Sequence, residues 1–313
     1  MRVNRRTFIG AGVGATVAAS LGRDLAFATG TPIVEPGTFD FIFFTDTHIE
    51  PELNAATGCA MCFRKIGGIK SDFAVMGGDH VFDALAVDNN RAKLLFDLYQ
   101  KTEQSLQMKV YNTIGNHDLF GISSTSGIEP NDPAYGKMLY EDRFGQKTFY
   151  SFDHKGYHFF VLDSVQPTAD TMWDARIDEE QLAWLAADLK RVGPSVPVIG
   201  ITHVPLVTAF ANYDDTPRAP QKYSTLSVGN SPQVLKLFEQ HNVVAVLQGH
   251  THINEVVSYK NTQFITSGAV CGNWWKGLRM GCPEGFTVVS LNHGKISTRY
   301  ETYGFKSVAP AGS

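Results

Sequence analysis

The sequence predicts an α/β fold with four layers, α/β/β/α, in which two mixed β-sheets pack face to face and helices cover the outside. Three observations support this prediction: short apolar runs recur along the chain, longer amphipathic stretches separate them, and strand-like alternation continues towards the C-terminus. The chain has 313 residues, of which 43% are hydrophobic, so it can bury a large core.

The predicted buried strands are five nearly continuous apolar runs, a pattern typical of strands that are covered on both faces. They read "FDFIFF", "SDFAVMGG", "KVYNTIG", "VPVIGIT" and "VVAVLQG". Helices are predicted between them, over residues 54–70, 85–107, 178–192 and 231–241. The alternating order of strands and helices favours a layered α/β domain.

Antiparallel strands are predicted in two further places. The segment "KTFYSFDHKGYHFFVLDS" indicates a hairpin around Lys155-Gly156. The C-terminal third, with "EVVSYKNTQFITSG" and "FTVVSLNHGKISTRYETY", indicates more antiparallel strands. We therefore expect a single domain over residues 38–305, followed by a tail over residues 306–313.

The N-terminus differs from the rest in composition and predicts an export signal over residues 1–28. An arginine pair, Arg5-Arg6, precedes a small apolar stretch over residues 8–21, and residues 26–28 form an A-x-A cleavage site. A membrane span needs roughly 20 apolar residues, so no stable membrane anchor is expected. A short linker over residues 29–37 follows, and we expect an exported protein, periplasmic or extracellular.

The arginine pair also resembles a twin-arginine signal, because Thr7, Phe8 and Ile9 follow it, although Asn4 replaces the more usual Ser or Thr. This resemblance implies the export machinery as a partner. Removal of residues 1–28 takes away four arginines and one aspartate, which changes the net charge from −4 to −7. No run of Lys or Arg remains to follow a phosphate backbone, so a nucleic-acid-binding patch is not expected.

The four cysteines have a spacing that does not fit a zinc ribbon. "CAMC" contains Cys59 and Cys62, but Cys271 and Cys282 are separated by ten residues, and the context of "CAMC" is not thioredoxin-like. Disulfides or free buried thiols are the interpretations that we favour.

Polar residues follow each of the five predicted strands, at the position where α/β sheets bind their ligands. They are Asp46 and His48 in "FTDTHIE", Asp79 in "GGDHVFD", Asn116, His117 and Asp118 in "IGNHDLF", His203 in "ITHVP", and His250 and His252 in "GHTH". In β conformation, residues two apart face the same way, so Asp46 can point with His48, and His250 with His252. The glycines at 77, 78, 115 and 249 allow tight turns and close approach.

This donor set is too large for one tetrahedral ion, but it suits two divalent or trivalent ions bridged by a carboxylate at roughly 3.5–4 Å. Imidazole, carboxylate and amide donors without thiolate suit Fe, Mn or Zn better than calcium. Such a pair of ions can hold a bridging hydroxide and two phosphoryl oxygens, which predicts hydrolysis of a small phosphoester substrate.

The ordered motifs D-x-H, G-D-x-x-x-D, G-N-H-D, H and G-H-x-H resemble those of the calcineurin-like metallophosphoesterases, over about residues 39–270. The resemblance implies a β-sandwich flanked by helices and a phosphodiesterase or phosphatase with two metal ions bridged by Asp79. The other ligands that it implies are Asp46, His48 and His252 for one ion, and Asn116, His203 and His250 for the other.

The same resemblance implies that His117 stands outside the coordination shell, where it stabilises the phosphoryl group or protonates the leaving group, and that Asp118 orients His117. "THVPLV" together with the G-N-H-D and G-H-T-H motifs looks similar to the cyclic-nucleotide phosphodiesterase-like branch. The metal-bound tyrosine of purple acid phosphatases has no counterpart among residues 80–83, so a tyrosinate chromophore is not expected.

Neighbouring polar residues have simpler interpretations. We expect His80 to have a supporting or core role, because it adjoins Asp79 and should point to the opposite side, and Asp83 to be a helix cap or an acceptor behind the ligands. Residues far from the strand ends are interpreted as solvent-exposed or packing groups. They are Asp153, His154, His158 and Glu255.

Two loops have alternatives that the sequence leaves open. In "GAVCGNWWKG", residues 268–277, the tryptophans either pack beneath the loop, or Asn273 and Trp274 line the substrate site. Residues 210–227 form either an ordinary loop or a lid from which Arg218 or Lys222 reaches a phosphate.

The leading hypothesis is dimetal-dependent hydrolysis of a phosphodiester or phosphomonoester. The alternative is a catalytically inactive scaffold or binding protein with the same fold, which loss of a ligand would favour; here each expected position is filled.

Overall fold

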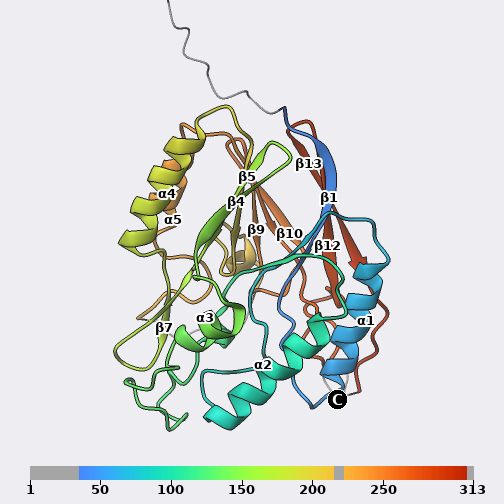
Figure 1. Cartoon of the computed structure of the whole chain (residues 1–313), viewed down its shortest axis with the longest axis vertical. Coiled ribbons are helices and arrows are strands. Elements are labelled where there is room, and N and C mark those ends of the chain that lie inside the picture. The colour runs from blue at the N-terminus through green and yellow to red at the C-terminus, as the bar shows by residue number, and fades with distance from the viewer. Residues whose placement is uncertain (1–34, 215–221, 309–313) are drawn as a thin grey trace, which may run out of the picture. The chain divides into compact units, whose positions relative to one another are not determined.

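Two β-sheets lie face to face in the computed structural model, which describes residues 35–214 and 222–308 (Figure 1). One sheet has the strand order β13-β12-β1-β2-β3. Its strands are β1 (Thr38–Phe44), β2 (Ala74–Met76), β3 (Val110–Asn112), β12 (Gly285–Asn292) and β13 (Lys295–Thr302). Strands β1, β2 and β3 are parallel, whereas β12 and β13 pair antiparallel.

The second sheet has the order β10-β11-β9-β8-β5-β4. Its strands are β4 (Tyr150–His154), β5 (Tyr157–Leu162), β8 (Val198–Thr202), β9 (Val243–Gln248), β10 (Glu255–Tyr259) and β11 (Thr262–Thr266). Strands β5, β8, β9 and β11 are parallel, and antiparallel strands close both edges. Both sheets are therefore mixed, as predicted.

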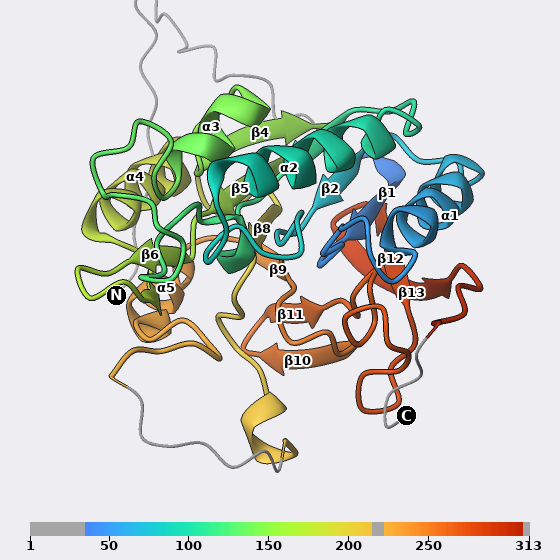
Figure 2. The same cartoon turned by 90° about the horizontal axis from the view of Figure 1, so that it is seen from below.

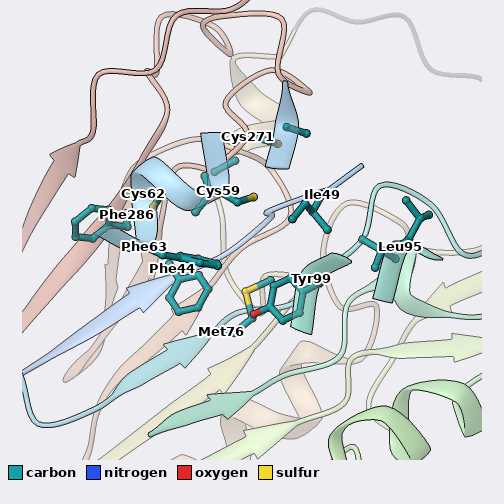
Figure 3. Close-up of a cluster of buried hydrophobic side chains, with 14 of the residues drawn as sticks. Phe44, Ile49, Cys59, Cys62, Phe63, Met76, Leu95, Tyr99, Cys271 and Phe286 are labelled. Atoms are coloured by element: carbon teal, nitrogen blue, oxygen red, sulfur yellow. The ribbon is translucent and has the colours of Figure 1, made fainter. Parts of the chain in front are cut away.

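Three hydrophobic clusters separate the layers. The cluster between the sheets includes Phe41 and Phe43 from β1 together with Phe159 and Leu247 from the second sheet. Helices α1 (Ala55–Gly67) and α2 (Asn89–Glu103) cover the outer face of the first sheet (Figure 3). Helices α4 (Glu179–Val192) and α5 (Ser231–Phe238) cover the second sheet. The predicted α/β/β/α arrangement is confirmed.

Capping residues set where the predicted helices begin. Helix α2 starts at Asn89 rather than at residue 85, because the Asp88 carboxylate accepts a hydrogen bond of 2.8 Å from the Arg91 amide. Asp178 caps α4 in the same way. The hairpin at Lys155-Gly156 is also confirmed: both residues have positive φ, 44° and 80°, and they join β4 to β5.

Three short elements were not predicted. They are α3 (Met138–Phe144) and the two-stranded ribbon of β6 (Val165–Pro167) and β7 (Trp173–Ala175). Single turns of 3-10 helix lie at Asn116–Asp118 and Phe210–Asn212. These segments are too short to show a clear period of hydrophobic residues.

The predicted export signal lies outside the described residues, as do most of the linker and part of the tail. Contacts within the chain group residues from Val34 onwards into one unit. In the described ranges, none of the helices has the length and apolar character that crossing a membrane requires.

Candidate metal centre

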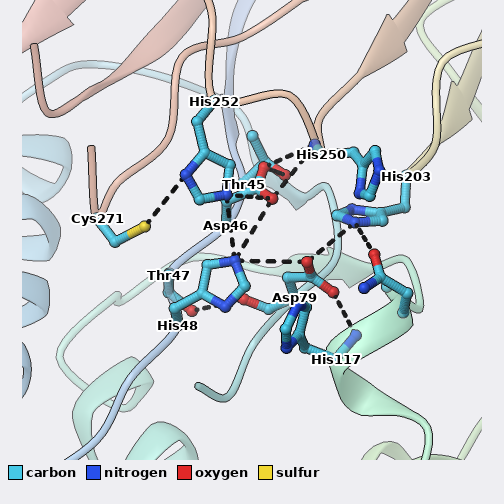
Figure 4. A network of polar contacts seen from close by, with 12 residues as sticks. Thr45, Asp46, Thr47, His48, Asp79, His117, His203, His250, His252 and Cys271 are labelled. Carbon is cyan, nitrogen blue, oxygen red and sulfur yellow. Dashed lines mark hydrogen bonds and ion pairs between the residues drawn. The ribbon is translucent and has the colours of Figure 1, made fainter. Parts of the chain in front are cut away.

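Five strand ends from the two sheets converge at one edge of the sandwich (Figure 2). They are the carboxyl ends of β1, β2 and β3 in the first sheet and of β8 and β9 in the second. The loops that follow them bring together all seven residues predicted as metal ligands (Figure 4). These are Asp46, His48, Asp79, Asn116, His203, His250 and His252.

The side chains of Asp46, His48 and His252 converge on one another. The Nε2 atom of His252 lies 3.3 Å from Asp46 Oδ1, and His48 Nε2 lies 3.8 Å from the same oxygen. The two Nε2 atoms are 3.2 Å apart. Asp46, His48 and His252 could therefore hold one metal ion, the grouping that the family resemblance implied.

A second group lies beside the first. His203 Nε2 is 3.2 Å from Asn116 Oδ1, and ligand atoms of His203, His250 and Asp79 all lie within 4.8 Å of one another. His250 and His203 meet edge to face, with ring centroids 5.2 Å apart. This group could hold a second ion.

Asp79 stands between the two groups. Its Oδ2 atom is 3.4 Å from His48 Nε2 and 3.1 Å from His203 Nε2. Its Oδ1 atom accepts a hydrogen bond of 2.8 Å from the His117 amide, which fixes the carboxylate plane. The Oδ2 atom therefore faces both groups, which is the position that a carboxylate shared by two ions would need.

A backbone carbonyl faces each of the four imidazoles, and for His48 it is Phe82 O, 3.4 Å from Nδ1. His203 Nδ1 donates to Gly77 O at 2.8 Å, His250 Nε2 to Thr225 O at 2.7 Å, and His252 Nδ1 to Gly272 O at 2.6 Å. A carbonyl only accepts, so in each neutral ring the other nitrogen carries the free lone pair. That nitrogen is the one available to a metal ion.

The backbone at the site is unusual. Asp46, His48, Asp79, His250 and His252 all have positive φ, between 38° and 72°. Such conformations cost energy for residues other than glycine and cluster at functional sites. The prediction that Asp46 and His48 converge through β alternation is therefore wrong in its reason: they lie beyond the strand, and left-handed turns direct them.

Glycine fits where a side chain would displace a ligand. A Cβ atom on Gly115 would lie 2.2 Å from Asp79 Oδ1, and one on Gly78, where φ is 104°, would lie 2.5 Å from His203 Nδ1. These two contacts confirm the close approach predicted for the glycines before the polar residues.

The centre is buried and its carboxylates attract positive charge. Asp46 and Asp79 are at most 1% exposed, and within residues 35–214 and 222–308 only imidazoles form ion pairs with them. Burial raises the pKa of both carboxyls, but the charge of His252 beside Asp46 and of His203 beside Asp79 brings each pKa below its usual range. Buried carboxylates that attract positive charge, surrounded by imidazoles, fit metal cations.

The imidazoles respond in two ways. Burial lowers the pKa of His203, but Asp79 raises it further, to about 9. Burial together with the charge of His203 lowers the pKa of His250 to about 4. Burial also lowers the pKa of His117 to about 4, against the opposing effect of Asp79. The centre therefore draws positive charge towards its carboxylates, and His117 beside it stays neutral.

His117 lies beside the seven predicted ligands, with its ring centroid 4.8 Å from that of His48. The predicted contact with Asp118 is wrong. The Asp118 carboxylate instead accepts hydrogen bonds from the amides of Gly115, Asp79 and His80, at 2.9–3.0 Å, and from His80 Nδ1 at 2.9 Å. Asp118 is fully buried, so it holds the Asp79 loop and not the His117 ring.

The carboxylate of Asp83 lies near the His117 ring. Its Oδ1 atom lies 3.8 Å from His117 Nδ1, and the same oxygen accepts a hydrogen bond from the Leu85 amide. His80 is fully buried between Asp118 and Asn112, which agrees with its predicted supporting role. A period-2 argument could not find the Asp83 contact, because it depends on the loop after β2.

The loop over residues 268–277 places its two tryptophans differently. Trp275 is fully buried, and its Nε1 atom donates to His48 O at 2.9 Å. Trp274 is partly exposed, and its ring is tilted by 44° against that of His48, with ring centroids 4.0 Å apart. For Asn273 the contacts are made by its backbone, with Gly277 and Lys276.

Cys271, which sequence reasoning did not place at the site, also lies there. Its Sγ atom is 3.7 Å from His252 Nδ1. All four cysteines are free thiols, and Cys59, Cys62 and Cys271 are buried. Of the two alternatives left open, free thiols are the one observed.

The predicted lid is described only in part, because Arg218 lies outside the described residues. Lys222 pairs with Asp170 at 2.8 Å. Glu255 accepts hydrogen bonds from Thr208 and Tyr213 and so anchors the segment after His203. Two further histidines pair with acidic residues: the partly exposed His154 with Asp72, and the buried His158 with Asp153 and Asp188.

Comparisons with known proteins agree with this geometry. The family model of calcineurin-like phosphoesterases matches residues 39–254. The serine/threonine-protein phosphatase CPPED1 of Bos taurus is 25% identical over 189 residues, which cover 59% of this chain and 53% of that protein. The match thus spans about half the length of that curated relative.

Solved structures share the fold at low sequence identity. A dimetal phosphatase from Danio rerio has a TM-score of 0.58 and 15% identity, and the match covers 85% of this chain and 96% of that one. GAP50, the anchor in the inner membrane complex of Plasmodium, has a TM-score of 0.55 and 16% identity, with 85% of each chain covered. A purple acid phosphatase from yellow lupin seeds has a TM-score of 0.53 and 14% identity, with 86% of this chain and 52% of that one covered.

The strand-end ligands, the mixed sheets and the family match over most of the chain lead to one assignment. This chain belongs to the calcineurin-like phosphoesterase family, a family of dimetal-dependent phosphoester hydrolases.

Proposed function

We propose that this protein hydrolyses a small phosphoester by means of two metal ions held at the edge of the sandwich. The observation that supports this most strongly is the position of Asp79 Oδ2, which lies within 3.4 Å of imidazole nitrogens from both ligand groups. When bound, the ions would activate water and neutralise charge on the phosphoryl group. Fe, Mn and Zn suit the mixed nitrogen and oxygen donors.

The residues divide into two sets around that carboxylate. Asp46, His48 and His252 would hold one ion, and Asn116, His203 and His250 the other. The hydrogen bonds from His203, His250 and His252 to backbone carbonyls keep each ring oriented before any metal arrives. The protein therefore supplies a preformed centre.

His117 would act on the substrate. Its Nδ1 atom faces Asp83, at 3.8 Å from Oδ1, so Nε2 is the atom left to contact the phosphoryl group or to transfer a proton to the leaving group. Asp83 would position this ring. The side chain of His117 is 22% exposed, whereas Asp46 and His48 are fully buried, so a substrate can reach it.

Other features remain part of the proposal. The substrate is a phosphodiester or a phosphomonoester, and "THVPLV" favours the cyclic-nucleotide phosphodiesterase-like branch. Trp274 and Asn273 are proposed to contact the substrate.

We also propose that residues 1–28 direct export, by the twin-arginine route, to the periplasm or the outside of the cell. A cell fractionation comparing the wild-type chain with an Arg5→Lys, Arg6→Lys variant tests that route, and equal export of both would contradict it.

The decisive experiment is hydrolysis by the purified protein, with metal content measured on the same samples. We expect manganese- or iron-loaded protein to hydrolyse bis-p-nitrophenyl phosphate or p-nitrophenyl phosphate. His117→Ala should lower kcat by about 10²–10⁴-fold with metals retained, as general-acid loss does. Asp79→Asn should lose metal and activity together. Full metal occupancy without hydrolysis of any phosphoester would contradict the proposal.

That negative result would favour the alternative, a scaffold or binding protein. GAP50 shows that an anchor protein shares this fold, so the fold alone does not decide between the two. The convergence of all seven ligands supports the enzyme, because a scaffold has no need to keep them oriented.

A further inference from the structure

We propose that Trp274 and Phe82 form an aromatic wall beside His117 that selects substrates with a flat, aromatic leaving group, such as an aryl or nucleobase-bearing alcohol. This inference rests on the proposed function, because it uses the position of His117 beside the leaving group. It adds the class of substrate, which the metal centre itself does not determine.

The position of Trp274 supports the first step. Its ring centroid lies 4.0 Å from that of His48, 5.0 Å from His117 and 5.3 Å from His252. Phe82 meets it edge to face at 5.5 Å. Trp274 thus touches two predicted ligands of one ion and also the residue that would contact the leaving group.

The chain holds Trp274 there at an energetic cost. Trp274 and Trp275 have φ values of 54° and 64°, and two consecutive bulky residues in the left-handed region are uncommon. The fully buried Trp275 secures them, because its Nε1 atom donates to His48 O and its ring packs directly on Gly58. A loop that only covered the core would need one tryptophan inside, and it would leave the second free to relax.

Exposure indicates the side from which the substrate comes. Beneath Trp274, His48 is fully buried and His252 is 4% exposed. His117 and Asp83, in contrast, have side chains that are 22% and 26% exposed, and Phe82 and Trp274 are also partly exposed. The side of the centre where His117 and the two aromatic rings lie is therefore open to solvent.

The chemistry of this surface gives the preference. A leaving group that contacts His117 must lie against this surface, where the aromatic rings of Trp274 and Phe82 are available as partners. Flat π-systems gain offset or edge contacts with such rings that a puckered, saturated ring does not. Flat leaving groups should therefore bind better than saturated ones of equal size and charge.

The test compares phenylphosphonate with cyclohexylphosphonate on the manganese-loaded full chain. Neither contains a phosphoester bond, so binding is measured directly by calorimetry and as competition against an ester substrate. Wild-type protein should prefer phenylphosphonate by about three- to tenfold, the range for an aromatic pair. The preference should fall to about onefold in Trp274→Leu and persist in Trp274→Phe.

Controls separate this role from folding and metal binding. Trp184→Leu removes a partly buried tryptophan that packs on Phe149 at 5.2 Å, and it should keep the preference. If Trp274→Leu loses metal, Phe82→Leu decides, with a smaller preference at full metal content. An unchanged preference in both variants, or none in the wild type, overturns the inference while ester hydrolysis stands. Selective binding that depends on Trp274 in a protein that hydrolyses no ester would overturn the proposed function instead.

Discussion

Asp118 shows how one buried carboxylate can serve a metal centre without touching it. It accepts hydrogen bonds from four backbone amides and from the His80 ring, and these bonds fix the turn that carries Asp79. Loss of such charge-assisted bonds leaves buried donors unsatisfied. The residue therefore acts on stability and on ligand placement.

We predict that Asp118→Ala lowers the free energy of unfolding by at least about 1.5–3 kcal/mol and weakens metal binding. Urea denaturation and metal analysis measure the two effects. His117→Ala, the neighbouring change, should alter stability much less, because no hydrogen bond to the His117 Nδ1 atom is made among the described residues. Equal losses of stability in Asp118→Ala and His117→Ala would indicate that the two side chains act together, as the sequence had predicted.

A second residue-scale prediction concerns pH. The Asp188 carboxylate is 7% exposed and contacts His158 Nε2 at 2.8 Å and Arg191 Nη2 at 2.6 Å. Burial raises its pKa, but hydrogen bonds from Arg191 and His158 lower it further, so its pKa lies below the usual value. Its contribution to stability is therefore complete above the unfolded-state pKa of about 3.9 and is lost as the pH falls through the lower folded-state pKa.

Asp188→Asn should accordingly lower the free energy of unfolding by about 1–3 kcal/mol at pH 7, with the difference shrinking below pH 4. Denaturant titrations across that range measure it. Asp153, the other carboxylate on His158, is 69% exposed and provides the control, since Asp153→Asn should cost much less. If the difference in free energy of unfolding between Asp188→Asn and wild type grew at low pH, the pKa of Asp188 would not be lowered by folding.

At the scale of elements, helix α1 and the loop over residues 268–277 share one contact that leaves no spare volume. A Cβ atom on Gly58 would lie 2.1 Å from Cζ3 of Trp275. Gly58→Ala should therefore destabilise the protein by about 1–3 kcal/mol through overpacking. It should also lower metal affinity, because Trp275 bonds to the backbone of His48.

Gly67→Ala is the matched control in the same helix. No atom lies within 4 Å of a Cβ at that position, so the change should be neutral or should stabilise by about 0.5–1 kcal/mol. Thermal unfolding of both variants checks the pair. If Gly58→Ala and Gly67→Ala had equal stability, the inference that Trp275 packs tightly against Gly58 of α1 would be contradicted.

The elements also show what the sequence could predict. Apolar runs followed by polar residues located β1, β2, β3, β8 and β9, because burial on both faces leaves a direct mark on composition. The directions of Asp46 and His48 came out correctly for the wrong reason, since left-handed turns and not strand alternation set them. The roles of Asp83 and Cys271 depend on loop contacts between distant residues, which no local pattern records.

At the scale of the whole molecule, the sheet arrangement was predictable because periodicity distinguishes covered strands from alternating hairpins. The sequence did not predict which C-terminal strands join which sheet. Strands β10 and β11 extend one sheet and β12 and β13 the other, a choice made by long-range pairing.

Metal binding should stabilise the whole molecule, because its ligands come from both sheets. At a metal concentration of 100 times Kd, the gain is about 2.7 kcal/mol for one site. We expect manganese to raise the midpoint of thermal unfolding and a chelator to reverse the increase. Gly67→Ala should keep this increase and Asp79→Asn should lose it. An equal increase in Asp79→Asn would place the stabilising ion elsewhere.

The distance along the chain between His48 and His252 has a consequence for biosynthesis. During translation, the donors proposed for the first ion that follow β1, Asp46 and His48, leave the ribosome about 200 residues before His252 exists. Until then only Asp46, His48 and the shared Asp79 are available, so the early segment can bind an ion only weakly. Tight metal capture must therefore wait until nearly the whole polypeptide has been made and β9 has joined its sheet, so a prematurely terminated chain would remain metal-free.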